Sequence, residues 1–114
     1  GFVRDTYFTD ELCIERKNSI GELAGNIKEK DERFFKELNR MINIKNTYLL
    51  IENNCVDDII EHRYDSQYNE LAFIRRILGI QKTANLYVNF VKKENMGFMI
   101  YEICYSALMN HILK

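Results

Sequence analysis

The sequence predicts an α/β domain in which helices cover the faces of a central sheet. Two observations carry this prediction. Apolar segments with strand character alternate with segments whose apolar residues recur at helical spacing, and 46% of the 114 residues are hydrophobic. This length favours a single domain, 1–114, with enough apolar content for a packed core. The predicted elements, in order, are a strand at 11–17, helices at 20–27 and 31–43, a strand at 47–52, a helix at 69–83, a strand at 86–91 and a helix at 95–113.

In the first half of the chain, polar residues that can cap helices separate the apolar runs. The first strand enters the core through residues 12–14. Ser19 is a candidate N-cap for the next helix, with Glu22 at its third position as in a capping box. Asp31 starts the second helix in the same way. The predicted buried stripe of that helix is Phe34, Leu38, Met41 and Ile42.

The second half continues the alternation. Residues 47–52 form a continuous apolar run ending in Glu52, which is typical of a strand buried on both faces. A turn follows at Asn53, and residues 56–65 are ambiguous between a loop and a turn of helix. Strand 86–91 has β-branched and aromatic content. The predicted buried residues of the last two helices are Leu71, Phe73, Ile74, Ile77 and Leu78, then Ile100, Ile103, Cys104, Ala107 and Leu108.

Composition restricts the partners. The net charge is −1, so no overall basic field attracts nucleic acid, and any polyanion site must come from local clusters of Lys and Arg. No apolar run approaches the length of a membrane span, and the three widely spaced cysteines indicate reduced thiols. We therefore expect a cytoplasmic protein without a membrane partner.

The most informative residues are Glu15 and Lys17. Side chains alternate along a strand, so both point to one face while Arg16 points to the other. A carboxylate there can hold a divalent cation, and an ammonium beside it can stabilise negative charge on a phosphate or on an attacking water. The alternative interpretation is a surface ion pair at the end of a strand.

Three sequence words in this order carry a resemblance: Ile14 to Leu23 (IERKNSIGEL), then Arg33-Phe34, then Tyr48 to Glu52 (YLLIE). They resemble the nuclease domain of the XPF family of structure-specific endonucleases, and most closely its short members in phages and bacteria. The resemblance implies a restriction-endonuclease-like three-layer domain, with a central mixed sheet flanked by helices and part of its N-terminal strands missing. It also implies a cofactor, Mg²⁺, for which Mn²⁺ may substitute.

The resemblance also assigns roles. It implies that Glu15 is catalytic and a metal ligand, that Lys17 orients the water or stabilises the phosphate, and that the backbone carbonyl of Arg16 completes the metal shell. It places Arg33 near the scissile phosphate or in a position to brace the acids, and it matches Glu52 to the acid that ends the next strand, with a role that stays open. The alternative for Arg33 is a helix-start arginine that is solvated or paired with Glu37.

Two positions depart from the family signature. Its Gly-Asp corresponds at best to Arg4-Asp5, so the metal ligand is either Asp5 or an acid upstream of Gly1. The acid expected after Glu-Arg-Lys is replaced by Gly21, and Glu22 is the nearest substitute.

We expect DNA contacts to be local and directed at structure instead of sequence, since Lys and Arg clusters contact phosphates. The predicted DNA-binding strip is Lys28, Lys30, Arg33, Lys36 and Arg40, and a second cluster is Arg75, Arg76 and Lys82. The alternative interpretation of these Lys and Arg residues is ordinary solvated helix faces, since acidic residues lie among them. Tyr64 and Tyr68 are stacking candidates for unpaired bases, although core or surface tyrosines are the favoured interpretation.

The last helix, 95–113, carries a second apolar row. A helix that is apolar on two sides needs two partners, so a homodimer through this helix is one interpretation and deep burial is the other. The second row is Phe98, Tyr101, Tyr105 and Met109.

The predicted function is a metal-dependent endonuclease that hydrolyses phosphodiester bonds in branched or flapped DNA. The alternatives are a catalytically inactive XPF-like DNA-binding or dimerisation module and a purely structural α/β protein.

Overall fold

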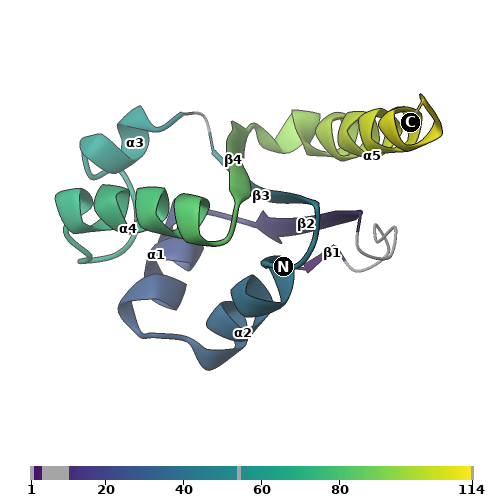
Figure 1. The fold of residues 1–114 in the computed structure, drawn as a ribbon. Helices are drawn as coiled ribbons and strands as arrows, with labels where there is room; N and C mark the ends of the chain where they lie inside the picture. Colours follow the sequence, from purple (N-terminus) through teal and green to yellow (C-terminus); the bar gives the residue numbers. More distant parts are fainter. Residues whose placement is uncertain (1, 4–10, 54, 114) are drawn as a thin grey trace.

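The structure, a computed structural model, describes residues 2–3, 11–53 and 55–113, and Asp5 therefore lies outside the described residues. Helices pack on both faces of one sheet (Figure 1). The elements are β1 (Phe2–Val3), β2 (Leu12–Lys17), α1 (Ile20–Lys28), α2 (Glu32–Met41), β3 (Asn46–Glu52), α3 (Asp57–Ile60), α4 (Glu70–Thr83), β4 (Leu86–Val91), the 3-10 helix η2 (Lys93–Asn95) and α5 (Met96–Leu113).

Among the described residues the strands form one mixed sheet in the order β1-β2-β3-β4. β1 pairs antiparallel with β2, whereas β2, β3 and β4 run parallel to one another. The register sets Lys17 opposite Ile51. The carboxyl ends of the three parallel strands therefore share one edge of the sheet, which is where α/β folds place their ligands.

Two apolar clusters lie on opposite faces of this sheet, because successive strand residues point to opposite sides. On one face, Cys13, Leu49 and Ile51 pack against α1, α2 and α4. On the other face, Ile14 and Leu50 pack against α5. The predicted three-layer domain with a mixed central sheet is confirmed.

Local capping explains where the helices begin. The Ser19 hydroxyl accepts from the backbone N–H of Glu22 at 2.9 Å, and the Glu22 carboxylate accepts from the backbone N–H of Asn18 at 2.8 Å. The Ser19 bond is that of the predicted capping box, while the Glu22 carboxylate binds one residue before the N-cap. Asp31 caps α2 and Asn69 caps α4 through side-chain acceptors on the first turn. Each such cap stabilises its helix by about 1 kcal/mol.

Four residues predicted to be buried are exposed, and those predictions were wrong. The exposed fractions are 45% for Ile42, 53% for Leu71, 59% for Leu78 and 44% for Leu108. A helix turns by about 100° per residue, so one that lies on a sheet buries only a narrow stripe. In α4 that stripe is Phe73, Ile77 and Ile80, and side chains one or two positions away point outward.

The ambiguous segment 56–65 contains a short helix, α3. Its Ile59 is fully buried and joins the cluster that α1, α2 and α4 cover. The rest of the segment wraps back toward α4, where the Tyr64 ring meets Phe73 edge-on with the ring centres 5.4 Å apart. Tyr68 also contacts Phe73. Both tyrosines therefore pack against the core, as the favoured interpretation of the sequence had it.

Candidate active site

Strand β2 brings Glu15 and Lys17 together on the face of the sheet that α1 and α2 cover. The Lys17 Nζ lies 3.5 Å from Glu15 Oε1. Both residues are buried, with exposed fractions of 4% for Glu15 and 6% for Lys17. The Lys17 ammonium also lies 4.9 Å from the centre of the Phe34 ring of α2, a cation–π contact. A carboxylate and an ammonium thus lie side by side where both are shielded from water.

Burial dominates the electrostatics of this pair. Loss of hydration raises the pKa of Glu15 from 4.5 to about 7, although the Lys17 charge works in the opposite direction and Glu37 of α2 raises the value a little further. The two effects oppose each other because desolvation disfavours the charged carboxylate while a nearby cation favours it. One lysine does not offset the full cost of desolvation, so this carboxylate gains from a second positive charge.

One oxygen of the same carboxylate is able to bind such a charge. Glu15 Oε2 is buried and has no hydrogen-bond partner among the residues that the structure describes, which is unusual for a buried carboxylate oxygen. Hard oxygen donors are the ligands that Mg²⁺ prefers, so this atom fits the divalent ion that the resemblance implies. Within 11–53 and 55–113, no three His, Cys, Asp or Glu residues cluster around a common point. The described residues therefore supply one suitable ligand, and Asp5 lies beyond them.

Glu52 lies on the opposite face of the sheet. Its Oε2 accepts from Arg16 Nη2 at 3.0 Å, and both side chains point to the α5 side, as strand alternation from Leu50 and Ile14 requires. The structure thus brings Glu52 together with the side chain of Arg16 and away from Glu15. This pairing occupies the arginine side chain and leaves its backbone carbonyl as the group that the resemblance assigns to the metal.

This chain is similar to known proteins over most of its length. A family model described as the ERCC4 domain matches residues 2–101. The chain belongs to the ERCC4 domain family. Among solved structures, XPF from Aeropyrum pernix matches with a TM-score of 0.62 and 16% sequence identity, over 90% of this chain and 47% of that chain. A comparison with curated proteins found no match.

These matches confirm the predicted XPF-family nuclease domain. At 16% identity the structural likeness shows the fold, and this chain spans about half the length of the Aeropyrum pernix protein. Membership of the ERCC4 domain family supports a function of the nuclease type. Among the helices described, none is long and apolar enough to cross a membrane.

In this ERCC4 domain the position expected to hold the acid is closely packed. A Cβ at position 21 would lie 3.1 Å from the backbone oxygen of Asp65, so any side chain there requires the chain between α3 and α4 to shift by a few tenths of an ångström. Glu22, the nearest substitute, is held by the backbone of Asn18 in the capping box. The structure thus engages Glu22 in capping and does not bring it to Glu15.

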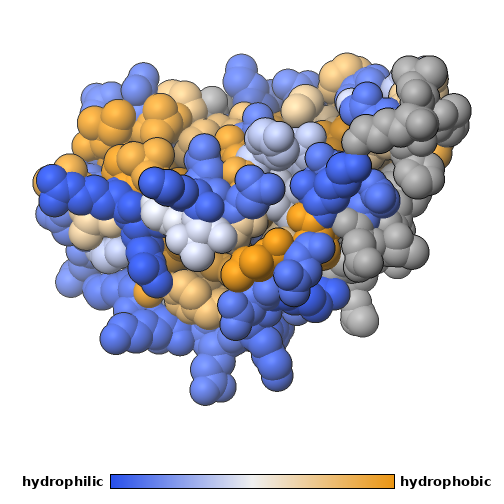
Figure 2. All heavy atoms as spheres, in the orientation of Figure 1, coloured by the Kyte–Doolittle hydropathy of each residue, from blue (hydrophilic) through white to orange (hydrophobic). Residues whose placement is uncertain are grey.

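The predicted DNA-binding strip lies along α1, the following loop and α2, and its side chains are exposed. Lys30 has a left-handed backbone with φ of 51° and turns the chain between the two helices. Arg33 lies in the first turn of α2. Arg40 Nη2 pairs with Glu37 Oε2 at 2.7 Å, so one acid partly neutralises the far end of the strip. Figure 2 shows a predominantly hydrophilic surface over α1 and α2.

Sequence reasoning missed the contribution of two aromatic neighbours. Phe34 was predicted only as a core residue, yet its ring lies under the Lys17 ammonium. Phe35 was not singled out, and its ring meets Phe34 edge-on with the centres 5.4 Å apart. The Phe-Phe pair was the available signal, because two consecutive aromatic residues in a helix necessarily face two different neighbours.

Proposed function

We propose that this ERCC4 domain is a Mg²⁺-dependent DNA endonuclease that hydrolyses phosphodiester bonds in branched or flapped DNA, with Mn²⁺ as an alternative ion. The observation that supports this most strongly is the buried Glu15–Lys17 pair, in which a desolvated carboxylate retains an unpartnered oxygen. Strongly perturbed carboxylates concentrate at functional sites. Family membership supplies the reaction class, and the pair supplies residues able to perform it.

In this proposal each residue has a distinct task. Glu15 would hold the ion, together with Asp5 and the backbone carbonyl of Arg16. The ion, when bound, supplies a Lewis acid and lowers the pKa of its water. Lys17 places a compact positive charge beside the phosphate and stabilises the negative charge that develops there. Phe34 excludes water from that ammonium, which strengthens its interaction with the phosphate. Arg33 contacts the DNA backbone next to the scissile bond.

The decisive experiment compares cleavage of a labelled flap DNA, a duplex and a single strand in Mg²⁺ by the wild type and by Glu15→Gln. We expect cleavage of the flap by the wild type and a loss of about 10²- to 10³-fold in the variant, as for other groups that stabilise charge. Metal binding gives an independent readout. Mn²⁺ should raise the melting temperature of the wild type and leave that of Glu15→Gln unchanged.

The matched control is Glu22→Gln, which removes a carboxylate from the same region. Its carboxylate lies in the capping box, so this variant should lose some stability and keep its cleavage rate. Full activity of Glu15→Gln would contradict the proposal. Equal loss in the two variants would show that the assay reports folding and would also contradict it.

The second candidate is a catalytically inactive module that binds DNA. Two observations favour it: Glu15 and Lys17 are only 4% and 6% exposed, and the described acids form no cluster around them. A module of this kind binds flap DNA and cuts it in neither Mg²⁺ nor Mn²⁺. The cleavage assay with the wild type therefore separates the two candidates directly.

We also propose that the domain forms a homodimer through α5. The aromatic residues of the second apolar row are exposed, 64% for Phe98, 65% for Tyr101 and 50% for Tyr105, on the side of the helix opposite the buried Ile103. Such a row indicates an interaction surface. Tyr101→Glu should convert a dimer to a monomer in sedimentation velocity, whereas Ser106→Glu, with the same charge outside the row, should not. A wild-type monomer at all concentrations contradicts this proposal.

A further inference from the structure

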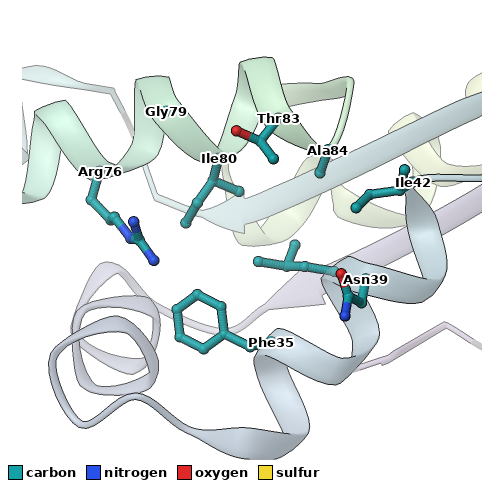
Figure 3. Close-up of a pocket in the computed structure, with 9 residues that line it drawn as sticks. Phe35, Asn39, Ile42, Arg76, Gly79, Ile80, Thr83 and Ala84 are labelled. Carbon is teal, nitrogen blue, oxygen red and sulfur yellow. The ribbon is translucent and has the colours of Figure 1, made fainter.

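A groove lies between α2 and α4. It consists of two hollows with cavity volumes of about 360 and 550 Å³, and both are lined by Phe35 and Arg76. Figure 3 shows the side chains of Phe35, from α2, and Arg76, from α4, in the same gap. We call these two adjacent hollows the α2–α4 groove.

The smaller hollow is apolar at its base and narrow. Leu38 of α2 and Ile80 of α4 form its floor, and both are buried. In Figure 3, the side chains of Arg76, Ile80 and Thr83 project from α4 toward α2. In Figure 2, apolar surface is visible between the polar side chains of α2 and α4. This hollow suits a flat apolar group.

The larger hollow is positively charged. Lys28 and Lys30, from the end of α1 and the loop after it, line it together with Arg76 and the ring of Tyr68. In the described part of the chain, no acidic residue lines either hollow. The overall net charge is −1, so this concentration of cations is a local property of the groove. Uncompensated cations beside aromatic rings suit a ligand with phosphates and bases.

Arg76 is held in place for such a ligand. Its guanidinium carbon lies 5.4 Å from the centre of the Phe35 ring, a cation–π contact that orients the planar group. A planar guanidinium presents paired N–H donors that match two phosphate oxygens. Phe35 therefore orients a group that is able to bind a phosphate.

We propose that the α2–α4 groove binds an unpaired stretch of nucleic acid, with Arg76, Lys28 and Lys30 on its phosphates and Phe35 and Tyr68 on its bases. The identity of the strand rests on the proposed function, in which it is the unpaired arm of a branched substrate. Phe34 contacts Lys17 and its neighbour Phe35 lines the groove, so the two sites lie on adjacent sides of one helix. In a duplex the base faces are stacked on one another and cannot contact Phe35 or Tyr68, so a duplex would make only the phosphate contacts and bind more weakly.

The test measures binding of a fluorescein-labelled oligothymidylate, about ten nucleotides long, to the full chain by fluorescence anisotropy in EDTA. Arg76→Gln should weaken binding about fivefold or more and reduce the slope of log affinity against log salt by about 0.7. Phe35→Leu should weaken binding about tenfold. Since Phe35→Leu also changes packing, its melting temperature is measured alongside, and Arg76→Gln, at an exposed residue, carries the test if that variant unfolds.

The matched control is Lys93→Gln. This residue carries the same charge, is exposed and lines neither hollow, so binding should change by less than about twofold. Equal effects of Lys93→Gln and Arg76→Gln would overturn the proposal, as would a duplex of the same length that competes as well as the single strand. The binding assay contains no divalent ion and measures no cleavage. A failure of the nuclease proposal therefore leaves this result intact.

Discussion

Glu52 binds Arg16 on one face of the sheet, at 3.0 Å, while Glu15 lies on the other face. Two acids that the sequence places on adjacent strands of one fold are thus separated by the sheet itself. The separation follows from the register, which sets Arg16 opposite Leu50 and so gives Arg16 and Glu52 the same orientation. The two acids should therefore respond differently to substitution.

The first prediction concerns Glu52→Gln. The ion pair with Arg16 is partly exposed, so its loss should lower the free energy of unfolding by about 1 kcal/mol or less. Cleavage of flap DNA in Mg²⁺ should stay close to the wild-type rate, because Glu52 does not face Glu15. Initial rates measured beside Glu15→Gln check this. A folded Glu52→Gln protein without activity would place Glu52 in the catalytic machinery.

The second prediction is that Glu15→Gln stabilises the metal-free protein. Burial raises the pKa of Glu15 to about 7, so the folded state binds this proton more tightly than the unfolded state does. Stability must then fall as pH rises from about 4.5 to 7. At pH 8 in EDTA, the glutamine should add on the order of 2 to 3 kcal/mol to the free energy of unfolding, and near pH 4.5 almost nothing. Urea titrations at the two pH values test this, and an equal effect at both would contradict it.

The third prediction compares two glycines of α1. Gly25→Ala should raise the free energy of unfolding by about 0.5 to 1 kcal/mol, because the added methyl group meets nothing within 4 Å and alanine favours the helix. Gly21→Ala gains the same propensity but brings its Cβ to 3.1 Å from the Asp65 backbone oxygen. We expect Gly21→Ala to be at least about 1 kcal/mol less stable than Gly25→Ala. Equal stability of the two variants in thermal denaturation would show that the loop yields without cost.

The fourth prediction concerns His62. Its Nδ1 lies 2.8 Å from Glu70 Oε2 and its Nε2 lies 2.7 Å from the backbone oxygen of Ser66, so a doubly protonated ring donates to both. The bond to Glu70, and then that to Ser66, raise the pKa of His62. The resulting stabilisation is complete below the pKa of an unfolded histidine and is lost as pH rises through the raised folded value.

His62→Asn should therefore lower the melting temperature at pH 5.5 and have little effect at pH 9. Asparagine is chosen because His62 has a left-handed φ of 57°, which asparagine tolerates, so the substitution adds no backbone strain. Glu70→Gln removes the other partner and should show the same pH dependence. A melting temperature lowered equally at both pH values would mean that the histidine acts through packing, such as its stacking on Tyr64.

Local rules predicted most of the fold. The caps at Ser19 and Asp31 depend on residues within one turn, and the alternation that puts Glu15 and Lys17 on one face depends on a single strand. Leu71 and Leu78, which are exposed, were mispredicted because they fit the apolar spacing of a helix as well as the buried residues do. Only the way the helix lies on the sheet decides which of its stripes is covered.

Long-range features could not be predicted. The partner of Glu52 depends on the register between β2 and β3, which no local pattern in either strand specifies. The α2–α4 groove joins Phe35 and Arg76, which lie far apart in the chain and meet only after the sheet has formed. Glu15 and Lys17 could be named from the sequence, but their burial, and therefore the raised pKa of the carboxyl group, required the packing of α2 above them.

Phe34 and Phe35 are adjacent in α2, and one ring contacts Lys17 while the other, about 100° further around the helix, lines the α2–α4 groove. Rotating α2 by one residue would exchange their surroundings and disturb both neighbourhoods together. An insertion or deletion within this helix is therefore much harder to accommodate during evolution than a substitution on its outer face. Among descendants of a common ancestor, we expect the spacing from Asp31 to this aromatic pair to be inherited without change even where the surrounding surface diverges.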